Sequence, residues 1–501
     1  MKKLFILYIF TVFVYIFSAQ TYGLIDPDEP RYAATAKNMV VSGDYIVPYF
    51  NGKLRINKPP LTYWLVAGSY KFFNINELSA RLPQIVLSLF FIFFSLIFLR
   101  NFFSEKELLS FLAILSSLPI FFYLARYCNT DMIVTVFFGL SLILFYKYFE
   151  NSKNIYLNLF YLTYLLANLS KGPVAYLIIL ILTIFLVIKK DFTILKNYKF
   201  WFLILIISLT PALYLIIVNI KTGGEFGVLQ LITRETAGRF LKGYRHPEPI
   251  YFYLKFFPIL FFPWSIFFIL NIGKLKELWH RNDLNKLSIL WFFVILIFFS
   301  ISKSKLISYI LPLSFPFSVI TAQIIAEKSF RIKKHYFVNF LILTIAGLSL
   351  FLIVKNYNFP EIDSLLPWAV IVISGILFIC ITSDTALSLS LLNLIVFLTI
   401  FIFGADFINN NKSEKVLENI KEKYKVVSYR RDLTGIAFYY GDYIKKDNIQ
   451  NIAFDNVSKI LIVSYKTDFK RIKNKMKFKK IVSTKRMIAA EVLDTNENYN
   501  K

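Results

Sequence analysis

Cysteine and charged residues are scarce in this chain of 501 residues, and each shortage excludes a class of protein. The two cysteines, Cys128 and Cys380, lie within or at the ends of apolar segments. They provide neither a disulfide framework nor the spacing of a metal site. Charged residues make up 18% of the chain, whereas 57% of the residues are hydrophobic. A soluble core cannot bury that much apolar surface, so a water-soluble fold is excluded for most of the chain.

The charges that are present have an excess of one sign. Lys and Arg number 57 against 31 Asp and Glu, which gives a formal net charge of +26. In a water-soluble protein this excess would indicate a nucleic-acid partner. No basic stripe alternates with a soluble fold here, so we expect no nucleic acid among the partners. Cytoplasmic loops and contacts with anionic membrane lipids account for the excess instead.

Long apolar runs are abundant and predict a polytopic α-helical membrane protein. Runs of about 17 residues form helices of ~25 Å, which matches the hydrocarbon thickness of a bilayer. Hydropathy predicts about 13 transmembrane helices, with an error of about one. The first is expected to be an uncleaved signal anchor, because its apolar run is long and no A-x-A cleavage site follows. The expected spans are 4–24, 83–100, 108–125, 129–149, 155–170, 172–188, 200–219, 250–272, 287–302, 305–326, 336–355, 367–383 and 386–408.

Basic residues predict how these spans are oriented, because short loops rich in Lys and Arg stay in the cytoplasm. Lys2 and Lys3 precede the first span, and the short loops 126–130 and 356–366 are nearly free of basic residues. The pattern predicts a bacterial inner-membrane protein with a cytoplasmic N-terminus and a periplasmic C-terminus. The basic loops expected inside contain Lys189, Lys190, Lys196, Lys199, Lys274, Lys276, Arg281, Lys286, Lys328, Arg331, Lys333 and Lys334.

Two domains are expected. Residues 1–408 form the transmembrane domain, with long periplasmic loops at 25–82 and 220–249, and loops of such length usually carry function. The first loop predicts two interfacial helices, near 30–42 and 60–73. Residues 409–501 are richer in charged and β-branched residues, which predicts a small soluble α/β domain. Its expected helices are near 412–424 and 467–476, and its expected strands near 425–429, 459–465 and 485–492.

Three acidic residues, Asp26, Asp28 and Glu29, directly follow the first span. Carboxylates beside hydrocarbon are costly, so they are usually paired or functional. Their mutual repulsion and low-dielectric surroundings should raise the pKa of at least one. Asp28 or Glu29 alone could instead cap the helix beginning near Pro30. One cap does not need three carboxylates. The D-x-D pattern of Asp26 and Asp28 is used for metal binding in soluble nucleotide-sugar transferases, but no doubly wound domain surrounds it.

A second motif in the first loop is Asn57-Lys58-Pro59-Pro60, followed by Leu-Thr-Tyr-Trp. The prolines fix the backbone, and the aromatic pair suits the membrane interface. A lysine held at headgroup depth is a suitable point charge for a lipid phosphate. A lysine that merely extends toward water from the membrane is the alternative interpretation.

Further polar residues recur at the outer ends of the spans. Each alone fits a lipid headgroup contact, but their shared side of the membrane predicts one polar cavity. A metal site is not indicated at His246, because no second histidine or cysteine lies at ligand spacing. The polar residues at the outer ends of the predicted spans are Arg126, Asp131, Lys171, Arg234, Glu235, Arg239, Arg245, His246, Glu248, Lys303 and Lys305.

Taken together, these motifs resemble membrane glycosyltransferases of the GT-C fold, the aminoarabinose transferase and protein O-mannosyltransferase group of families 39 and 83. The matching features in the first loop are an acidic pair before Arg-Tyr-Ala, the Ser-Gly-Asp and Lys-Pro-Pro-Leu-x-Tyr-Trp runs, and Ser-Ala-Arg-Leu-Pro. The resemblance continues through 126–131, 170–173, 246–253 and 302–312 and covers about 400 residues. The α/β tail resembles the outer domain of the aminoarabinose branch.

The resemblance implies transfer of a sugar from a polyprenyl-phosphate donor to a lipid A, glycan or protein acceptor at the periplasmic face. It implies catalytic roles for Asp28, Glu29 and Asp131. Residues implied to bind the donor phosphate or lipid are Lys58, Arg126, Lys171, Arg239, Lys305 and Tyr309. Residues implied to bind the acceptor or to be structural are Arg31, Tyr63, Arg81, His246 and Glu248.

One departure from the family pattern concerns a cofactor. The aminoarabinose branch has Glu before Lys-Pro-Pro, and that Glu and a histidine matching His246 are associated with a metal. Asn57 occupies the Glu position here, and neutral Asn is a poor ligand for zinc. We therefore predict no cofactor at this position, with a divalent metal as the alternative interpretation.

Two other functions are alternatives to sugar transfer. A lipid or glycolipid transporter or flippase would also have many spans and buried charges, but the hydropathy pattern has no inverted repeat and the polar residues gather at one face rather than at the midplane. A structural assembly factor would keep the fold without the activity. The acidic pair and the Lys-Pro-Pro motif argue against it.

Overall fold

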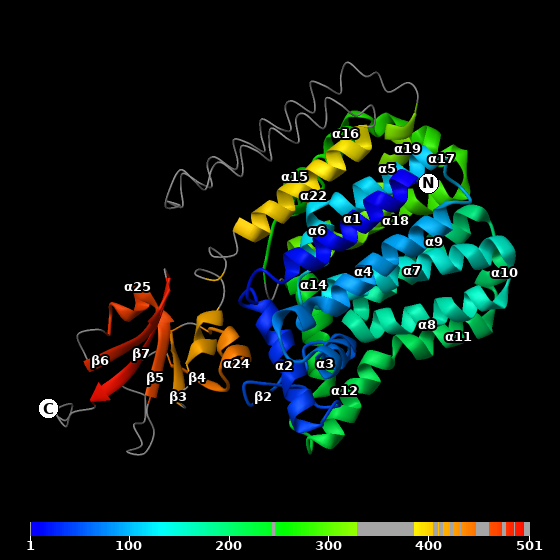
Figure 1. Ribbon diagram of the computed structural model, residues 1–501. Coiled ribbons are helices and arrows are strands. Elements are labelled where there is room, and N and C mark those ends of the chain that lie inside the picture. The colour runs from blue at the N-terminus through cyan, green and yellow to red at the C-terminus, as the bar shows by residue number, and fades with distance from the viewer. Residues whose placement is uncertain are drawn as a thin grey trace.

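The chain forms a large helical bundle followed by a small sheet (Figure 1). The computed structural model describes residues 2–242, 246–327, 385–403, 409, 414–420, 424–430, 432–446, 460–472, 477–484 and 486–494. The helices of the bundle are α1 (Lys2–Ala19), α2 (Asp28–Ser42), α3 (Leu61–Phe73), α4 (Glu77–Leu99), α5 (Glu105–Ser117), α6 (Pro119–Leu124), α7 (Thr130–Asn151), α8 (Asn154–Lys171), η1 (Gly172–Ala175), α9 (Tyr176–Lys189), α10 (Phe192–Leu195), α11 (Tyr198–Ser208), α12 (Thr210–Lys221), α13 (Val228–Thr233), η2 (Arg234–Gly238), α14 (Arg239–Lys242), α15 (Phe252–Leu260), α16 (Trp264–Leu270), η3 (Ile272–Lys274), α17 (Leu275–Arg281), α18 (Asp283–Ile301), η4 (Ile307–Leu313), α19 (Ser314–Ala326) and α22 (Thr385–Phe403).

Many of these helices are long and apolar enough to cross a membrane. Within the described part of the chain there are seven such stretches, or eight if the bent pair α15 and α16 is one span. The chain is therefore a multi-pass membrane protein. The predicted spans 336–355 and 367–383 lie outside the described residues.

Three predicted spans are interrupted rather than straight, and proline follows or forms each break. The span predicted at 108–125 is divided into α5 and α6 before Pro119, and the span at 200–219 into α11 and α12 before Pro211. The span at 250–272 is bent by 119° between α15 and α16, next to Pro263. Proline lacks the N–H that would continue a helix, which explains the breaks.

Aromatic side chains fill the interior of the bundle. Trp291 of α18 stacks on Phe315 of α19 with ring centroids 5.1 Å apart, and Phe138 of α7 lies 5.7 Å from Trp291. Gly139 lets α7 approach α4 closely, because a Cβ atom there would lie 2.4 Å from the ring of Phe91. Such close packing holds the helix ends, and the polar residues on them, in fixed positions.

The first long loop has the two helices that were predicted, α2 and α3, at the end of the bundle opposite the N-terminus (Figure 1). Gly43 ends α2 in a left-handed conformation (φ 73°) and donates its N–H to the Met39 carbonyl. A hairpin of β1 (Tyr49–Phe50) and β2 (Lys53–Leu54) follows, and its turn residues Asn51 and Gly52 both have positive φ. Asn-Gly is the pair that such two-residue turns favour.

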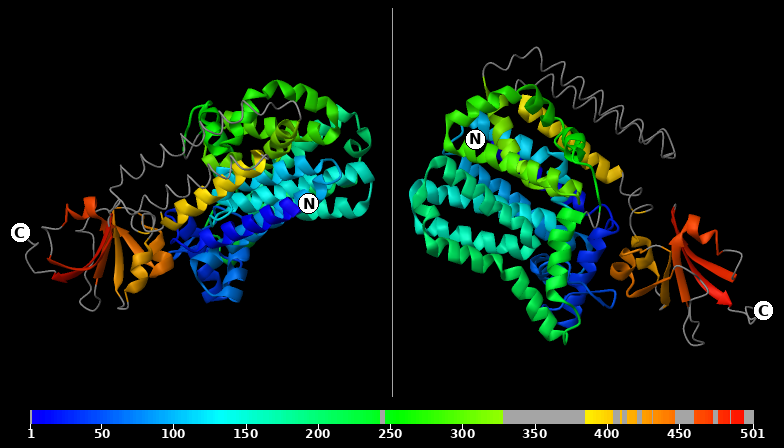
Figure 2. Two further views of the ribbon diagram at one scale, coloured as in Figure 1. Left: turned by 45° about the horizontal axis from the view of Figure 1, so that its top comes forward. Right: turned by 180° about the vertical axis from the view of Figure 1, so that it is seen from behind.

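The C-terminal part is a five-stranded sheet in the order β4-β3-β5-β7-β6. The central strand β5 pairs in parallel with β3 and antiparallel with β7, so the sheet is mixed. Figure 2 shows this sheet beside the end of the bundle that carries α2, with α24 between them. Its elements are η6 (Lys415–Asn419), β3 (Lys425–Tyr429), α24 (Gly435–Tyr439), β4 (Tyr443–Lys446), β5 (Ile460–Tyr465), α25 (Lys466–Phe469), β6 (Lys477–Ser483) and β7 (Met487–Asp494).

Three of these strands, β3, β5 and β7, lie where the sequence predicts them. The helix predicted near 467–476 is the single turn α25, and the described part of the range 412–424 forms the short 3-10 helix η6 rather than a long α-helix. The strands β4 and β6 and the helix α24 were not predicted.

Candidate functional site

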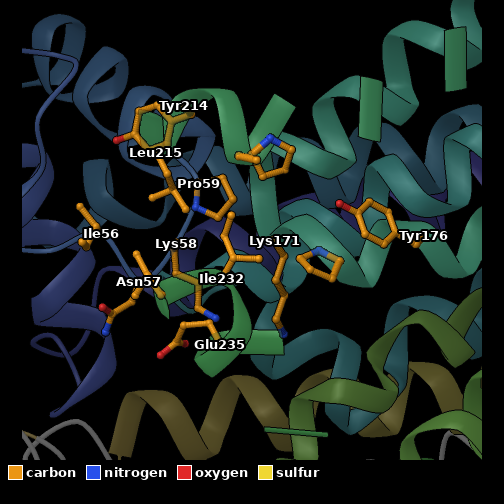
Figure 3. A pocket seen from close by; sticks show the side chains of 14 residues that line it. Ile56, Asn57, Lys58, Pro59, Lys171, Tyr176, Tyr214, Leu215, Ile232 and Glu235 are labelled. Atoms are coloured by element: carbon orange, nitrogen blue, oxygen red, sulfur yellow. The ribbon is translucent and has the colours of Figure 1, made fainter. Parts of the chain in front are cut away.

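A cavity of about 110 Å³ lies at the end of the bundle that carries α3, where the Lys-Pro-Pro motif meets the ends of several helices. Figure 3 shows Asn57, Lys58, Lys171 and Glu235 around the same space. Tyr214 of α12 and Tyr176 of α9 add aromatic walls. The cavity therefore combines two lysines with an apolar lining. The remaining lining residues are Ile56, Pro59, Pro173, Pro211, Ala212, Leu215, Leu231 and Ile232.

Asp131 and Lys171 form a buried ion pair beside this cavity. Asp131 lies in the first turn of α7, where Asn129 caps the helix by accepting the N–H of Asp131 at 2.9 Å. The Asn129 amide also donates to Asp131 Oδ2 at 3.0 Å, while Lys171 Nζ contacts Oδ1. The two side chains are only 11% and 9% exposed. Asp131 thus fixes the Lys171 ammonium at the cavity wall.

Two residues of η4 complete this group. The Lys171 ammonium lies 4.4 Å from the ring centroid of Tyr309, which is a cation–π contact. Ser308 is hydrogen-bonded to Asp131, and the charge of Lys58 also acts on that carboxylate. The structure therefore brings together four of the predicted residues, Lys58, Asp131, Lys171 and Tyr309, from four separate segments.

Asp28 is the first residue of α2, and its side chain is 53% exposed. Its carboxylate lies 3.6 Å from Arg31 and within electrostatic range of Arg55. Burial raises the pKa of the Tyr32 phenol, and Tyr63, Asp28 and Asp131 act in the same direction. Both predicted acids, Asp28 and Asp131, therefore lie within electrostatic range of one tyrosine.

Burial raises the pKa of the Asp26 carboxyl, and the nearby Asp432 carboxylate acts in the same direction. Asp26 accepts hydrogen bonds from the N–H and hydroxyl of Thr434, which act against the shift. The low-dielectric surroundings that the sequence predicts for this cluster are therefore found at Asp26.

Glu29 has a different environment from the one that a catalytic role needs. It is fully buried, and its carboxylate accepts hydrogen bonds from Arg81 Nε at 2.8 Å and from Arg81 Nη2 at 2.7 Å. The backbone N–H groups of Ile25 and Cys128 donate to the same carboxylate at 2.8 and 2.9 Å. Four hydrogen bonds occupy both oxygens, so the geometry favours a structural role for Glu29.

Arg81 is one of the five residues predicted to bind the acceptor or to be structural, and its hydrogen bonds favour the structural role. Besides Glu29 it donates to the carbonyls of Ala19, Tyr22 and Gly23 at 2.8–2.9 Å. These carbonyls lie at and beyond the C-terminus of α1, where helix carbonyls lack intrahelical partners. Arg81 therefore caps α1 and joins it to α2 and α4.

Arg126 and Lys305 were predicted to contact the donor, but both are buried among protein groups. Arg126 is fully buried, donates to the Phe122 carbonyl and to the Ser18 hydroxyl, and stacks on the Phe122 ring. Lys305 is 2% exposed, and its ammonium donates to the carbonyls of Glu248 and Ser302. Neither side chain lines the cavity.

Of the predicted residues of the second loop, Glu235 lines the cavity, whereas His246 and Glu248 do not. His246 and Glu248 are exposed, and their backbones pair with Lys305 and Lys303. The backbone of Arg239 begins α14, and its side chain lies outside the described residues. Tyr63 is buried in the first loop, where it stacks on Tyr32 and accepts a hydrogen bond from Arg55.

The residues that would hold a metal do not converge. Asn57 of the first loop lines the cavity, whereas His246 of the second loop is exposed and does not line it. In the part of the chain that the structure describes, no three His, Cys, Asp or Glu side chains are grouped as metal ligands. The residues present at this position therefore do not fit a zinc site, which needs three or four such ligands.

The sequence predicted Glu235 only as one of the polar residues of a shared cavity, and it projects into the cavity from the π-helical turn η2 with 14% of its side chain exposed. A π-helical turn often marks a functional site, but no sequence pattern predicts such a turn. Tyr214 and Arg55 were missed. The hydroxyl of Tyr214 donates to the Ile46 carbonyl, 168 positions away, whereas Arg55 contacts Tyr32 and Tyr63 within the first loop.

Known proteins with similar sequences or folds are membrane glycosyltransferases where their names state a function. The family of dolichyl-phosphate-mannose-protein mannosyltransferases matches residues 57–216. An uncharacterized protein from Aquifex aeolicus is 33% identical over 376 residues, 73% of each chain. An undecaprenyl phosphate-alpha-4-amino-4-deoxy-L-arabinose arabinosyl transferase from Shewanella sediminis is 27% identical over 63% of this chain and 58% of that protein.

A solved structure has the same fold. The crystal structure of ArnT from Cupriavidus metallidurans bound to undecaprenyl phosphate superposes with a TM-score of 0.75 over 96% of both chains, at 16% sequence identity. The similarity extends through the bundle and the C-terminal sheet.

Proposed function

Because the chain belongs to the GT-C membrane glycosyltransferases that include the aminoarabinose transferases and protein O-mannosyltransferases, we propose that it transfers a sugar from a polyprenyl-phosphate donor to an acceptor. The acceptor is a lipid A, glycan or protein group. The donor class follows from the named relatives, which act on undecaprenyl-phosphate-linked aminoarabinose. A transporter or flippase is less well supported, since the named relatives are transferases.

The observation that carries this proposal is the group of cations at the cavity. Lys58 and Lys171 face the same space, and the rest of its lining is mostly tyrosine, proline and aliphatic side chains, together with Asn57 and Glu235. Lysine ammonium groups are suitable partners for a phosphate, and an apolar wall beside them suits a polyprenyl chain. Asp131 keeps Lys171 in place by its buried ion pair.

The proposed reaction is a displacement at the anomeric carbon. An acceptor hydroxyl attacks this carbon, the bond from the carbon to the phosphate oxygen breaks, and the polyprenyl phosphate leaves. Lys58 and Lys171 stabilise the charge that develops on the leaving phosphate. Asp28 takes the proton of the acceptor hydroxyl as general base. If the acceptor is a phosphate, no proton is removed, and Asp28 orients the acceptor instead.

We propose that the site lies at the periplasmic face of the bacterial inner membrane. Nucleotide sugars are absent there, which explains why the donor is anchored to a lipid. The first loop and the C-terminal sheet lie together at the end of the bundle opposite the N-terminus (Figure 1). Alkaline phosphatase fused after residue 408 should be active, whereas fusions after residues 190 and 280 should be silent. A silent fusion after 408 would overturn this orientation.

We also propose that the chemistry uses no resident metal at the position of Asn57. The neutral amide and the exposed His246 do not make a zinc site. This leaves the neutralisation of the phosphate to lysines alone.

Substitution of Asp28 tests the catalytic assignment. Asp28→Asn keeps the size of the side chain but removes the base, so transfer should fall ~10²-fold or more while the protein folds normally. The exposure of Asp28 makes a folding defect unexpected. Asp26→Asn should reduce transfer less. Equal, mild losses in both variants would mean that these acids only support the loop, and the role of base would pass to Asp131.

A further inference from the structure

The C-terminal domain, which contains the five-stranded sheet, holds Asp26 and Pro27, the two residues that precede Asp28. The backbone N–H of Thr434 donates to Asp26 Oδ1 at 2.9 Å. The Thr434 hydroxyl lies within hydrogen-bonding distance of the same oxygen and of the Pro27 carbonyl, the latter at 2.9 Å. Both residues immediately before Asp28 are therefore held by one residue of a domain more than 400 positions away in the sequence.

A second contact from the same segment lies on the other side of Asp28. Arg31 is shared, with Nη1 3.6 Å from Asp28 Oδ1 and Nη2 3.3 Å from Asp432 Oδ2. The hydroxyl of Tyr443 donates to the other oxygen of Asp432. Asp432 thus aims the guanidinium of Arg31 toward Asp28.

The stretch around Asp28 is consequently held at several points while Asp28 itself stays open. Asp26 and Pro27 are held by Thr434, Glu29 by Arg81, and Arg31 by Asp432. The Asp28 carboxylate is 53% exposed, in contrast to the fully buried Glu29. An acid presented to solvent from a rigid support is what a positioned catalytic group needs.

Docking of the C-terminal domain does not depend on this segment alone. Lys37 Nζ donates to the Phe438 carbonyl at 2.8 Å, and Lys415 pairs with Glu77 at 2.7 Å. The side chain of Asn51 exchanges hydrogen bonds of 2.8 and 2.7 Å with the backbone of Tyr443. Loss of a single contact at Thr434 should therefore leave the domain in place.

We propose that Thr434 and Asp432 are positioning residues for Asp28, so that the C-terminal domain forms part of the active site. Thr434 fixes the backbone before Asp28, and Asp432 orients its charged neighbour Arg31. This inference rests on the proposed function, because it assigns both residues a role relative to the proposed base. A small displacement of a catalytic group is enough to slow a reaction considerably.

The test is a comparison of kcat and KM for purified full-length variants. The donor is undecaprenyl-phosphate-linked 4-amino-4-deoxy-L-arabinose and the acceptor is lipid A. Thr434→Val keeps the shape and removes the hydroxyl, so kcat should fall about tenfold with donor KM nearly unchanged. Thr434→Ser retains the hydroxyl and should restore most of kcat. Asp432→Asn should lower kcat about threefold, since its ion pair is partly exposed.

Two control variants separate positioning from docking. Lys37→Met removes a docking contact away from Asp28, and Asp442→Asn neutralises an exposed acid of the same domain. Both should resemble the wild type. Equal losses in Thr434→Val and Lys37→Met, or no loss in Thr434→Val, would overturn the inference while transfer by the wild type upholds the proposed function. A wild-type protein that transfers no sugar from any lipid-linked donor would overturn both.

Discussion

Replacing Arg81 tests whether the Arg81–Glu29 pair is structural, as its geometry indicates. In Arg81→Met, the Glu29 carboxylate stays buried but loses two charge-assisted hydrogen bonds of 2.8 and 2.7 Å. Three backbone carbonyls also lose their donor. Breaking a fully buried pair by removing one partner costs about 3–5 kcal/mol. We therefore expect a large loss of stability, comparable with the whole stability of many domains.

The measurement is the thermal unfolding midpoint of purified protein in detergent. Arg31→Met is the matched control, because Arg31 lies in the same loop and pairs with acids that are 44–53% exposed. Exposed pairs contribute about 0–1 kcal/mol, so this variant should unfold near the wild-type temperature. In the double variant Arg81→Met, Glu29→Met no charge remains buried without a partner, and stability should partly return.

Two results would refute this reasoning. Arg81→Met could unfold at the same temperature as Arg31→Met, which would mean that the buried pair contributes little. Alternatively, Glu29→Gln could fold with wild-type stability and lose all transfer. That outcome would return Glu29 to the catalytic role that the sequence predicts.

Three further predictions concern the donor, the metal and pH. Lys58→Ala should lower transfer about 10–150-fold, because a charge-assisted phosphate contact is lost. Lys53 is an exposed lysine of the same loop, so Lys53→Ala should leave transfer unchanged. Equal activities of the two variants would contradict the donor site. Transfer should persist in excess EDTA, and activity that returns only when zinc is added back would disprove the assignment at Asn57. Burial raises the pKa of Glu414 well above its usual range and also that of Asp26, so the folded chain holds protons more tightly than the unfolded chain. The stability that this adds should be present below the ordinary carboxyl pKa of about 4 and be lost as pH rises above it, measured by thermal unfolding. A pH dependence that is unchanged in the double variant Glu414→Gln, Asp26→Asn would contradict this.

The sequence predicts the parts of the fold whose pattern is local. The helices α2 and α3 follow from aromatic and basic residues suited to an interface, and β3, β5 and β7 from runs of β-branched residues. The strand β6 was missed because its sequence, KFKKIVS, is rich in lysine. Lysine is favoured on edge strands, where it discourages pairing with other chains, and there it hides the alternation of a buried strand.

Hydropathy also predicts the depth of a polar residue in the membrane, but not the direction in which its side chain points. Arg126 and Lys171 both lie near the C-terminal ends of helices, at α6 and α8. Lys171 lines the cavity, whereas Arg126 is buried against Phe122 and Ser18. The difference depends on the rotation of each helix about its axis, which packing determines.

Contacts between distant segments account for the remaining differences. Glu29 and Arg81 are 52 positions apart, and each alone looked functional because the pairing cannot be read from one sequence. The contact between Asp26 and Thr434 spans 408 positions. Only the folded chain shows that a charged residue has its partners within the protein.

The measurement that tests the proposed function most directly is the donor requirement of the purified protein. Lipid A is incubated with undecaprenyl-phosphate-linked 4-amino-4-deoxy-L-arabinose or with a nucleotide sugar, and the product is analysed by mass spectrometry. We expect the mass of one sugar to be added with the lipid-linked donor, and this addition to be strongly reduced in Asp28→Asn and Lys58→Ala. Transfer from a nucleotide sugar without any lipid carrier would contradict the proposed function.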